Sequence, residues 1–534
     1  MTRARRRLGT GALLLRGGVY FLLAVALTWP LILSPATLVP GGLRTDVFNS
    51  LWGYWFVAEG LADGHFPVHT TLLNWPEGGR LLVADPLNSL LAAPLTLSLG
   101  APFAYSVMVI LHLTLSGVFA DAAGRALGGR GWVAGVAFMA SPIGLSHLQN
   151  GSSEAAAVAW LPLAVLGVVR VTENNLAPEV VRRRVLLAGL GLALAAIGSG
   201  WYAGLGAFLL AGAFVLTGSS RRVLPAIVVG ALILLPFAAA YQGLAGAADG
   251  LVDIKDPDIL ARLRRTVGAA DPLTFVMPGE FRSPDFARLE QNASDLVHTA
   301  YLGGALVLLA LWKGRRPALW LALVLCLVLA LGPVLVVGGG AVHWHGRAFP
   351  LPWTWIEALP GFVSLSLLYR LATLAPLCLG LLADRAPGWL APLLLLETMF
   401  VSPARTLPEL TPVPVSAGLV AARDAGEGAV ISLPASFART RLYEQTVHGH
   451  PLAASLNSGV TPSGLRVLAA LRKVAKHETD WAAAEGVARG EGVRFVLVHR
   501  AVPIEATFQT SIRALRDHGR VVSTSEELLV YAIY

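Results

Sequence analysis

Residues 318–338 read ALWLALVLCLVLALGPVLVVG and carry no charged side chain. A helix needs roughly 20 mostly apolar residues to cross a bilayer, so this stretch is long enough to span one. Lys313, Arg315 and Arg316 come directly before it, as expected for the cytoplasmic end of a span under the positive-inside rule. The stretch therefore predicts a transmembrane helix whose first residue lies on the cytoplasmic side.

The composition of the whole chain supports the same interpretation. Of its 534 residues, 55% are hydrophobic and 14% are charged, and the mean hydropathy is +0.63, whereas a soluble domain has about 25% charged residues. This composition excludes a disordered chain. The two cysteines, Cys326 and Cys378, lie in apolar runs, which excludes a soluble disulfide scaffold. The sequence predicts a large α-helical polytopic membrane domain.

The net charge of +8 comes largely from short basic clusters between apolar runs. It predicts no nucleic-acid partner, because a surface that binds phosphates needs its basic residues on one continuous solvent face. With the N-terminus in the cytoplasm, all these clusters fall on the cytoplasmic side. The clusters are Arg3/Arg5/Arg6/Arg7, Arg182/Arg183/Arg184, Arg221/Arg222 and Lys313/Arg315/Arg316.

We expect about eleven transmembrane helices in a domain of residues 1–403. Residues 86–99 are too short to span comfortably, so they are predicted to form an interfacial or re-entrant helix. Large outer loops are predicted at 36–100, 242–298 and 339–364. The predicted spans are 17–35, 101–124, 131–147, 152–170, 185–199, 201–217, 223–241, 299–312, 318–338, 365–383 and 389–403.

The composition becomes ordinary near the C-terminus, and residues 404–534 are predicted to form an α/β domain on the outer face. The segments 429–434 and 493–500 are typical of buried strands, and 463–489 and 504–518 are typical of helices. The last residues, VVSTSEELLVYAIY, indicate a terminal hairpin.

Two carboxylates in the first outer loop are candidate site residues, because ionisable groups close to a bilayer are costly and often functional. Asp46 precedes Trp52, Tyr54 and Trp55, whose spacing fits a helix lying in the membrane interface. A carboxylate held there is suited to act as a general base. Asp85 precedes the predicted re-entrant helix. Both positions also fit helix N-caps, which leaves a structural alternative for each.

Two further groups of polar residues lie next to predicted spans. His147, Gln149, Asn150 and Glu154 crowd an outer turn in SHLQNGSSEAAAVAWLPL; they form either a substrate site or a polar network that closes a helical hairpin. Arg370 lies in VSLSLLYRLATLAPLCL. Its planar guanidinium suits phosphate recognition, and snorkelling to the outer headgroups is the alternative.

The chain lacks the familiar metal and nucleotide motifs. His343 and His345 lie two residues apart in a loop without a third ligand nearby, which is a weak indication of a metal site. The patterns of P-loops, dinucleotide-binding turns, zinc proteases and hydrolase nucleophile elbows are missing from the sequence. No definite cofactor is predicted, and the participation of a divalent metal ion stays open.

Several segments carry a resemblance to a known class of proteins. They are RTDVFNSLW, DPLNSLLAAPLTLSLGAPFAYSV, HLQNGSSEAAAVAWLPL, the YLGG of NASDLVHTAYLGG, PLPWTWIEALPGFVSLSLLYR and LYEQTVHGHPL. Together they resemble bacterial polytopic membrane glycosyltransferases of the C-type (GT-C) superfamily, over most of the chain. Members of this class carry a catalytic aspartate in the first large outer loop, and Asp46 matches that position.

The resemblance implies an enzyme of the bacterial cell envelope, in the inner (cytoplasmic) membrane, with the C-terminal domain in the periplasm. It would transfer a hexosyl or pentosyl group from a polyprenyl-phosphate donor to a glycan, lipid or protein acceptor. A phosphate leaving group needs no proton, so one carboxylate can suffice. Asp46 is expected to deprotonate the acceptor, with inversion of configuration, and Arg370 to stabilise the phosphate. Asp85, His147 and Glu154 are expected to orient the substrates.

Two other functions stay compatible with the sequence. A transporter or flippase for a lipid-linked glycan would carry broken half-helices at the bilayer midplane, whereas the polar residues here gather at the outer interface. An inactive relative that serves as an assembly subunit is the third interpretation. An Asp46 side chain turned away from any cavity would favour it.

Overall fold

The computed structural model describes residues 9–534 except 44, 175, 246, 248, 252–256, 266–267, 277–298, 360, 363, 402–407, 435–437, 455–458 and 501. The chain forms two compact units. Unit 1 comprises Met1–Ser50, Ala84–Ala240 and Lys255–Thr411, and unit 2 comprises Leu51–Val83, Tyr241–Ile254 and Pro412–Tyr534. Unit 2 therefore includes two segments that the sequence places in the outer loops of the membrane domain.

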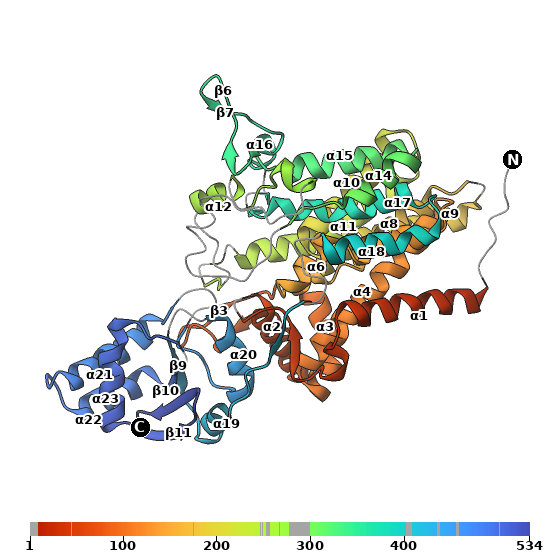
Figure 1. Ribbon diagram of the computed structural model, residues 1–534. Coiled ribbons are helices and arrows are strands. Elements are labelled where there is room, and N and C mark those ends of the chain that lie inside the picture. Colours follow the sequence, from red (N-terminus) through yellow and green to blue (C-terminus); the bar gives the residue numbers. More distant parts are fainter. Residues whose placement is uncertain are drawn as a thin grey trace. The chain divides into compact units, whose positions relative to one another are not determined.

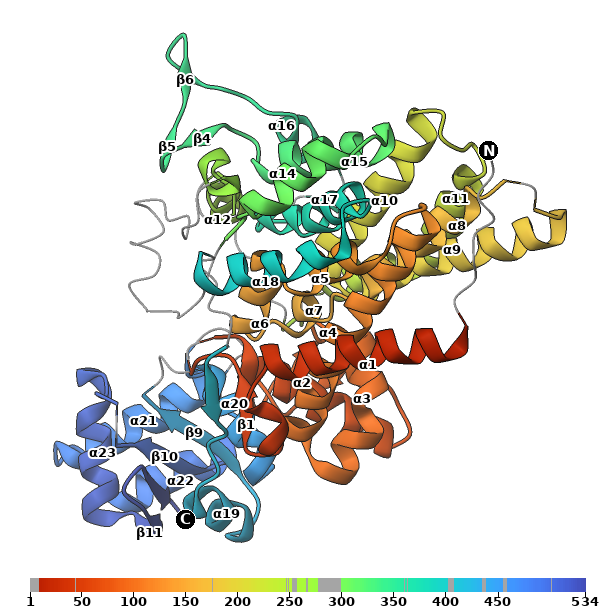
Figure 2. The same ribbon diagram turned by 45° about the vertical axis from the view of Figure 1, so that its right-hand side comes forward.

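Unit 1 is built mainly from helices, drawn from red to cyan in Figures 1 and 2. Figure 2 shows α4, α5, α8 and α9 together, and α8 packs on α9 while α4 packs on both α5 and α8. The helices up to residue 245 are α1 Thr10–Leu27, α3 Pro86–Leu99, α4 Ala101–Ala126, α5 Trp132–Met139, α6 Pro142–Gln149, α7 Ser153–Ala156, α8 Trp160–Val171, α9 Pro178–Gly198, α10 Gly200–Leu216 and α11 Val223–Ala245.

The later part of unit 1 adds shorter helices and small hairpins. The helices are α12 Pro257–Arg264, η2 Pro272–Phe275, α14 Gly304–Lys313, α15 Pro317–Ala330, α16 Trp353–Ile356, η4 Leu368–Thr373, α17 Leu374–Ala383 and α18 Ala391–Phe400. The strands are β1 Leu38–Pro40, which pairs with β8 Leu410–Pro412, and the hairpins β4 Val336–Val337 with β5 Gly340–Ala341 and β6 His343–Trp344 with β7 Arg347–Ala348.

Two stretches predicted as single spans are broken into shorter helices. Within 131–147, α5 ends and α6 begins at a new N-cap, where the Ser141 hydroxyl accepts from the Gly144 N–H (3.3 Å). Pro142 occupies the first turn of α6, a position that proline favours, whereas it cannot continue a preceding helix. Within 152–170, the short α7 is separated from α8. The prediction of one continuous helix in each stretch is wrong.

Three of the described helical segments are long and apolar enough to cross a membrane: Thr10–Leu27, Ala101–Ala126 and Val223–Leu244. In the first and third only 17% of the residues are buried, and Leu22 and Leu232 are 66% and 62% exposed. Large exposed apolar surfaces are rare on soluble monomers and suit contact with lipid. These helices support a membrane location for unit 1.

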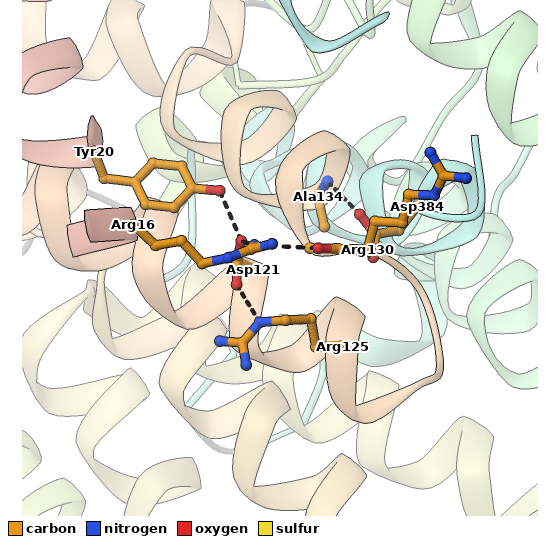
Figure 3. A network of polar contacts seen from close by, with 8 residues as sticks. Arg16, Tyr20, Asp121, Arg125, Arg130, Ala134 and Asp384 are labelled. Carbon is orange, nitrogen blue, oxygen red and sulfur yellow. Dashed lines mark hydrogen bonds and ion pairs between the residues drawn. The ribbon is translucent and has the colours of Figure 1, made fainter. Parts of the chain in front are cut away.

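A buried polar network joins α1 to α4 (Figure 3). Asp121 accepts from Arg16 and from the Tyr20 hydroxyl (3.1 Å), both on α1, and from Arg125, one turn further along α4. Asp121 is 1% exposed, so these donors replace the water that its carboxylate loses on burial. We refer to these four residues as the Asp121 network. They hold α1 on the rest of unit 1.

Unit 2 is an α/β structure built on a four-stranded sheet, drawn in blue in Figure 1. β9 Ala429–Leu433 and β10 Val493–His499 are parallel, and β12 Leu528–Ala532 pairs antiparallel with both β10 and β11 Arg520–Thr524. The strands predicted at 429–434 and 493–500 and the terminal hairpin are confirmed.

Helices cover both faces of this sheet. Alternate residues of β9 face opposite sides: Ile431 packs with α21 Pro462–Ala475, α22 Trp481–Glu491 and α23 Ala506–His518, and Val430 packs with α19 Ala417–Asp424 and α20 Ala438–His448. The predicted helices at 463–489 and 504–518 are confirmed, the first as two helices. A small hairpin, β2 His69–Thr70 with β3 Gly79–Arg80, completes unit 2.

The aromatic residues after Asp46 form part of α2 Val47–Ala62, whose later turns belong to unit 2. Trp52 and Tyr54 are each 2% exposed. The Trp52 indole stacks on Phe56 (ring centroids 4.7 Å apart) and donates from Nε1 to Gln445 Oε1 (2.7 Å). Two of the three rings predicted to anchor an interfacial helix are therefore buried in protein instead, and that of Trp52 packs in the core of unit 2.

Candidate active site

Asp46 lies directly before α2, at the end of the loop that follows β1. Its backbone N–H donates to the Asn150 carbonyl (2.9 Å), and its Oδ2 accepts from the Ser152 hydroxyl (3.1 Å). The side chain is half-buried. Its carbonyl accepts from the Ser50 N–H (3.0 Å) in the first turn of α2. Asp46 thus stands at a helix start and also faces the turn between α6 and α7.

The turn at 150–154 approaches α2 closely. Gly151 has a φ of +65°, and a Cβ there would lie 2.5 Å from the backbone nitrogen of Val47, so this approach requires glycine. The Ser50 hydroxyl donates to the Gly151 carbonyl (2.8 Å) and accepts from the Ser153 N–H (3.3 Å). The turn is therefore fixed against the helix that Asp46 precedes.

Arg370, on η4, reaches the same turn. Its Nη1 donates to Glu154 Oε1 (3.2 Å), and its Nη2 lies 3.5 Å from the Ser152 Oγ. The side chains of Arg370 and Glu154 are 14% and 21% exposed, so the ion pair is partly withdrawn from water. The Ser152 hydroxyl consequently contacts both Asp46 and Arg370.

Asp85 caps α3 and is 3% exposed. Its Oδ1 accepts from the backbone N–H (3.3 Å) and from the Nδ2 (2.6 Å) of Asn88, and the Ser153 side chain lies close to the same carboxyl. Burial raises the pKa of Asp85 to about 7, and the nearby Glu154 carboxylate adds to the rise. The helix-cap interpretation of Asp85 is confirmed, and this carboxyl also belongs to the group around the turn.

Asn88 ties Asp85 to three other helices. Its Oδ1 accepts from His112 Nε2 on α4 (3.0 Å) and from Trp160 Nε1 on α8 (3.0 Å), and its Nδ2 donates to the Gly198 carbonyl at the end of α9 (2.7 Å). Every one of these partners comes from a different segment of unit 1. The position of the Asp85 carboxyl is therefore set by the packing of the bundle.

His147 contacts the helix that carries Arg370. Its ring centroid lies 6.3 Å from that of Tyr369, and its Nε2 lies 3.4 Å from the Thr373 Oγ1. The residue is 1% exposed. On the same helix α6, Gln149 accepts from the Glu409 N–H through Oε1 (2.8 Å). His147 thus lies beside η4 and contacts residues before and after Arg370 in the sequence.

The turn brings most of the predicted site residues together. Ser152 donates to Asp46 and Glu154 accepts from Arg370, and Ser153, between them in the chain, lies close to Asp85. The described side chains here comprise the carboxylates of Asp46, Asp85 and Glu154 and the guanidinium of Arg370, so carboxylates outnumber the guanidinium by three to one. We call these four residues and Ser152 the Asp46 site.

Among the residues that the structure describes, no group of three or more His, Cys, Asp or Glu side chains could hold a metal ion. His343 lies in β6, and His345 follows in the tight turn with a φ of 49°. The described side chains thus support no metal site at this hairpin.

Comparisons with known proteins give matches in structure only. No known family profile matches the chain, and no curated protein matches it in sequence. The arabinofuranosyltransferase AftD from Mycobacteria, in an R1389S mutant form, matches with a TM-score of 0.56 and 15% identity, over 98% of this chain and 42% of AftD. The oligosaccharyltransferase of Archaeoglobus fulgidus matches with a TM-score of 0.51 and 15% identity, over 92% of this chain and 69% of that protein.

Both of these proteins are GT-C glycosyltransferases. The chain has the GT-C fold. The resemblance found in the sequence is therefore confirmed at the level of the fold. The chain spans less than half the length of AftD.

Within this GT-C fold, sequence reasoning missed the uncharged members of the site. Ser152 connects Asp46 to Arg370 and Asn88 fixes Asp85, but a serine or an asparagine near a span costs far less than a charge and so attracts no attention. The two serines could have been noticed from the sequence, because in GSSE at 151–154 they directly precede the candidate residue Glu154. Nothing in the sequence indicates that Asn88 meets His112 and Trp160, since those contacts depend on how three helices pack.

Proposed function

We propose that this chain is a membrane glycosyltransferase that moves a sugar from a polyprenyl-phosphate donor to an acceptor hydroxyl, with Asp46 as general base. One observation carries the proposal: Ser152 links the Asp46 carboxylate to Arg370, so a proton acceptor and a cation that suits phosphate lie one hydroxyl apart. The GT-C fold supports it. AftD is named as an arabinofuranosyltransferase, and the Archaeoglobus fulgidus protein as an oligosaccharyltransferase with an acceptor peptide.

In the proposed reaction, the acceptor oxygen attacks the anomeric carbon while Asp46 takes its proton. The bond between that carbon and the phosphate oxygen breaks, and the electron pair leaves with the polyprenyl phosphate. Attack from the face opposite the leaving group inverts the configuration. The leaving group departs as an anion, so the site needs a cation there more than it needs an acid. Arg370 supplies that cation.

The remaining predicted residues orient the substrates in this scheme. Glu154 holds Arg370 through one oxygen of its carboxylate (3.2 Å). Asp85 with a pKa of about 7 is protonated in part at neutral pH, so it can donate a hydrogen bond to a sugar oxygen as well as accept one. His147 supports η4 next to Arg370.

The proposal extends to the placement of the chain in the cell. Residues 1–403 cross the inner membrane of a bacterium about eleven times, with the N-terminus in the cytoplasm. Residues 404–534 form a periplasmic domain that presents the acceptor or binds a partner. The transferred group is a hexosyl or pentosyl unit, and the acceptor is a glycan, a lipid or a protein of the cell envelope.

A direct test incubates the detergent-purified chain with a panel of radiolabelled polyprenyl-phosphate sugars. We expect release of unlabelled polyprenyl phosphate and transfer of the sugar, or its hydrolysis, for at least one donor. A chain that instead moves the intact labelled lipid across a vesicle membrane, with the sugar still attached, would be a flippase. A chain that binds none of the donors and releases no product would contradict the proposal.

A further inference from the structure

Ser152 occupies a helix N-cap without capping the helix. It precedes α7, and its backbone carbonyl accepts from the N–H groups of Ala155 and Ala156 (3.1 and 2.8 Å), but its hydroxyl makes no capping hydrogen bond. Serine at this position normally accepts from the N–H two or three residues later. Ser141, one helix earlier, does so with the Gly144 N–H. The Ser152 hydroxyl is therefore used for something other than its own helix.

The two contacts of this hydroxyl use its donor and an acceptor lone pair. A serine hydroxyl has one proton to give and two lone pairs to accept with. Asp46 as a carboxylate can only accept, so the Ser152 proton points at Asp46 Oδ2 (3.1 Å); Arg370 can only donate, so its Nη2 points at a Ser152 lone pair (3.5 Å). The direction of both bonds follows from the chemistry of the two partners.

The position of the Ser152 hydroxyl is fixed by hydrogen bonds to its two neighbours in the chain. Ser152 is 2% exposed, and the residues on either side of it are held by Ser50, through the Gly151 carbonyl and the Ser153 N–H. A donor that cannot turn away holds one carboxylate oxygen of Asp46 in one direction. The orientation of this carboxylate then no longer has to be found during the reaction.

We propose that Ser152 is the positioning residue of the Asp46 site: its hydroxyl orients the Asp46 carboxylate toward the acceptor and sets the distance between this base and Arg370. The inference rests on the proposed function. It adds to the proposed function a residue that touches neither substrate and that acts through Asp46 and Arg370. A serine whose hydroxyl only filled space would be replaced by alanine without effect on either group.

The test compares Ser152→Ala with Ser152→Thr, which keeps the hydroxyl, and with Ser146→Ala. Ser146 is a matched control, because it is buried in the preceding helix and its hydroxyl donates only to the Ile143 carbonyl (2.8 Å). For Ser152→Ala we expect kcat to fall about 10- to 100-fold, as for the loss of a hydrogen bond to a charged group, while KM for the donor changes little. Ser152→Thr regains most of the rate, and Ser146→Ala keeps all of it.

A second readout does not depend on activity. In chains labelled with ¹³C at aspartate carboxyl groups, the infrared band of Asp46 is assigned by its loss in Asp46→Asn. We expect this band to shift in Ser152→Ala and to stay in place in Ser146→Ala. A shifted band in a chain that transfers no sugar would contradict the proposed function but keep the hydrogen bond. An unshifted band, or a kcat of Ser152→Ala equal to that of the wild type, would overturn the role of Ser152.

Discussion

The Asp121 network and the Asp46 site are both polar groups within the helices of unit 1, and they are built in opposite ways. In the first, one carboxylate that is 1% exposed meets two guanidiniums and a phenol. In the second, the described side chains comprise three carboxylates and the one guanidinium of Arg370, which pairs with Glu154, and Asp46 and Glu154 are only half-buried. The Asp121 carboxylate pairs with two guanidiniums, so its charge is fully compensated in the fold. In the Asp46 site the described carboxylates outnumber the guanidinium, and their mutual repulsion raises the electrostatic energy of the site.

The difference shows in the charge state of Asp85. Burial and the neighbouring Glu154 raise its pKa to about 7, so part of the negative charge near the turn is removed by a proton rather than by a second guanidinium. Such perturbed groups cluster at functional sites more often than in structural networks. The comparison therefore separates residues that hold unit 1 together from residues suited to chemistry.

The largest effect on the fold is expected for Asp121→Asn. This change leaves Arg16 and Arg125 without the carboxylate that they share, and breaking a buried ion pair from one side costs about 3–5 kcal/mol. We expect a much lower yield of folded protein and a clear fall in Tm in detergent, measured by thermal unfolding.

Asp46→Asn serves as the matched change in the other region. An asparagine Oδ1 can still accept from the Ser152 hydroxyl, so its Tm should stay close to that of the wild type. Equal destabilisation by Asp121→Asn and Asp46→Asn would show that the two regions do not differ in the way described.

Arg370→Ala is expected to lower the transfer rate about 100-fold, because it removes the cation that would face the leaving phosphate. The change also leaves Glu154 without its partner, which could lower the rate by unfolding alone. The double change Arg370→Ala with Glu154→Gln removes that unpaired charge. It should regain stability but not rate, as measured by Tm and by release of polyprenyl phosphate. Recovery of the rate in the double variant would rule out the role of Arg370.

The charged part of the site could be predicted from the sequence, and its connections could not. The sequence singles out Asp46, Glu154 and Arg370 because charged side chains near a bilayer are energetically costly and often functional. The structure joins these three residues through one turn. The contacts of Ser152 depend on a glycine at 151 that lets this turn approach Val47. Side-chain packing across segments far apart in the chain leaves no pattern in a single sequence.

Helix type was easier to predict than helix continuity. The apolar run at 201–217 corresponds to α10 Gly200–Leu216, whereas the mainly apolar run at 131–147 is split at Ser141. Mean hydropathy does not register a break that one capping serine and one proline produce. The burial of Trp52 and Tyr54 was missed for a related reason, since aromatic rings suit both a membrane interface and a protein core.

The smallest predicted effect concerns pH and Asp85→Asn. The folded chain binds the Asp85 proton more tightly than an unfolded chain, whose aspartate pKa is about 3.9. The wild type should therefore lose stability as the pH rises from about 4 to about 7, and no further above that. The Tm of Asp85→Asn relative to the wild type should rise by about 1–3 °C across this range. A difference in Tm that is the same at every pH would mean that Asp85 is not protonated in the folded chain.

The most direct measurement is the single-turnover rate of sugar transfer by Asp46→Asn, with the donor on which the wild type is active. If Asp46 is the general base, the rate falls at least about 100-fold, while the Tm and the affinity for the donor stay close to those of the wild type. A rate within about threefold of the wild type, in a folded chain that binds the donor, would show that Asp46 does not act as the base.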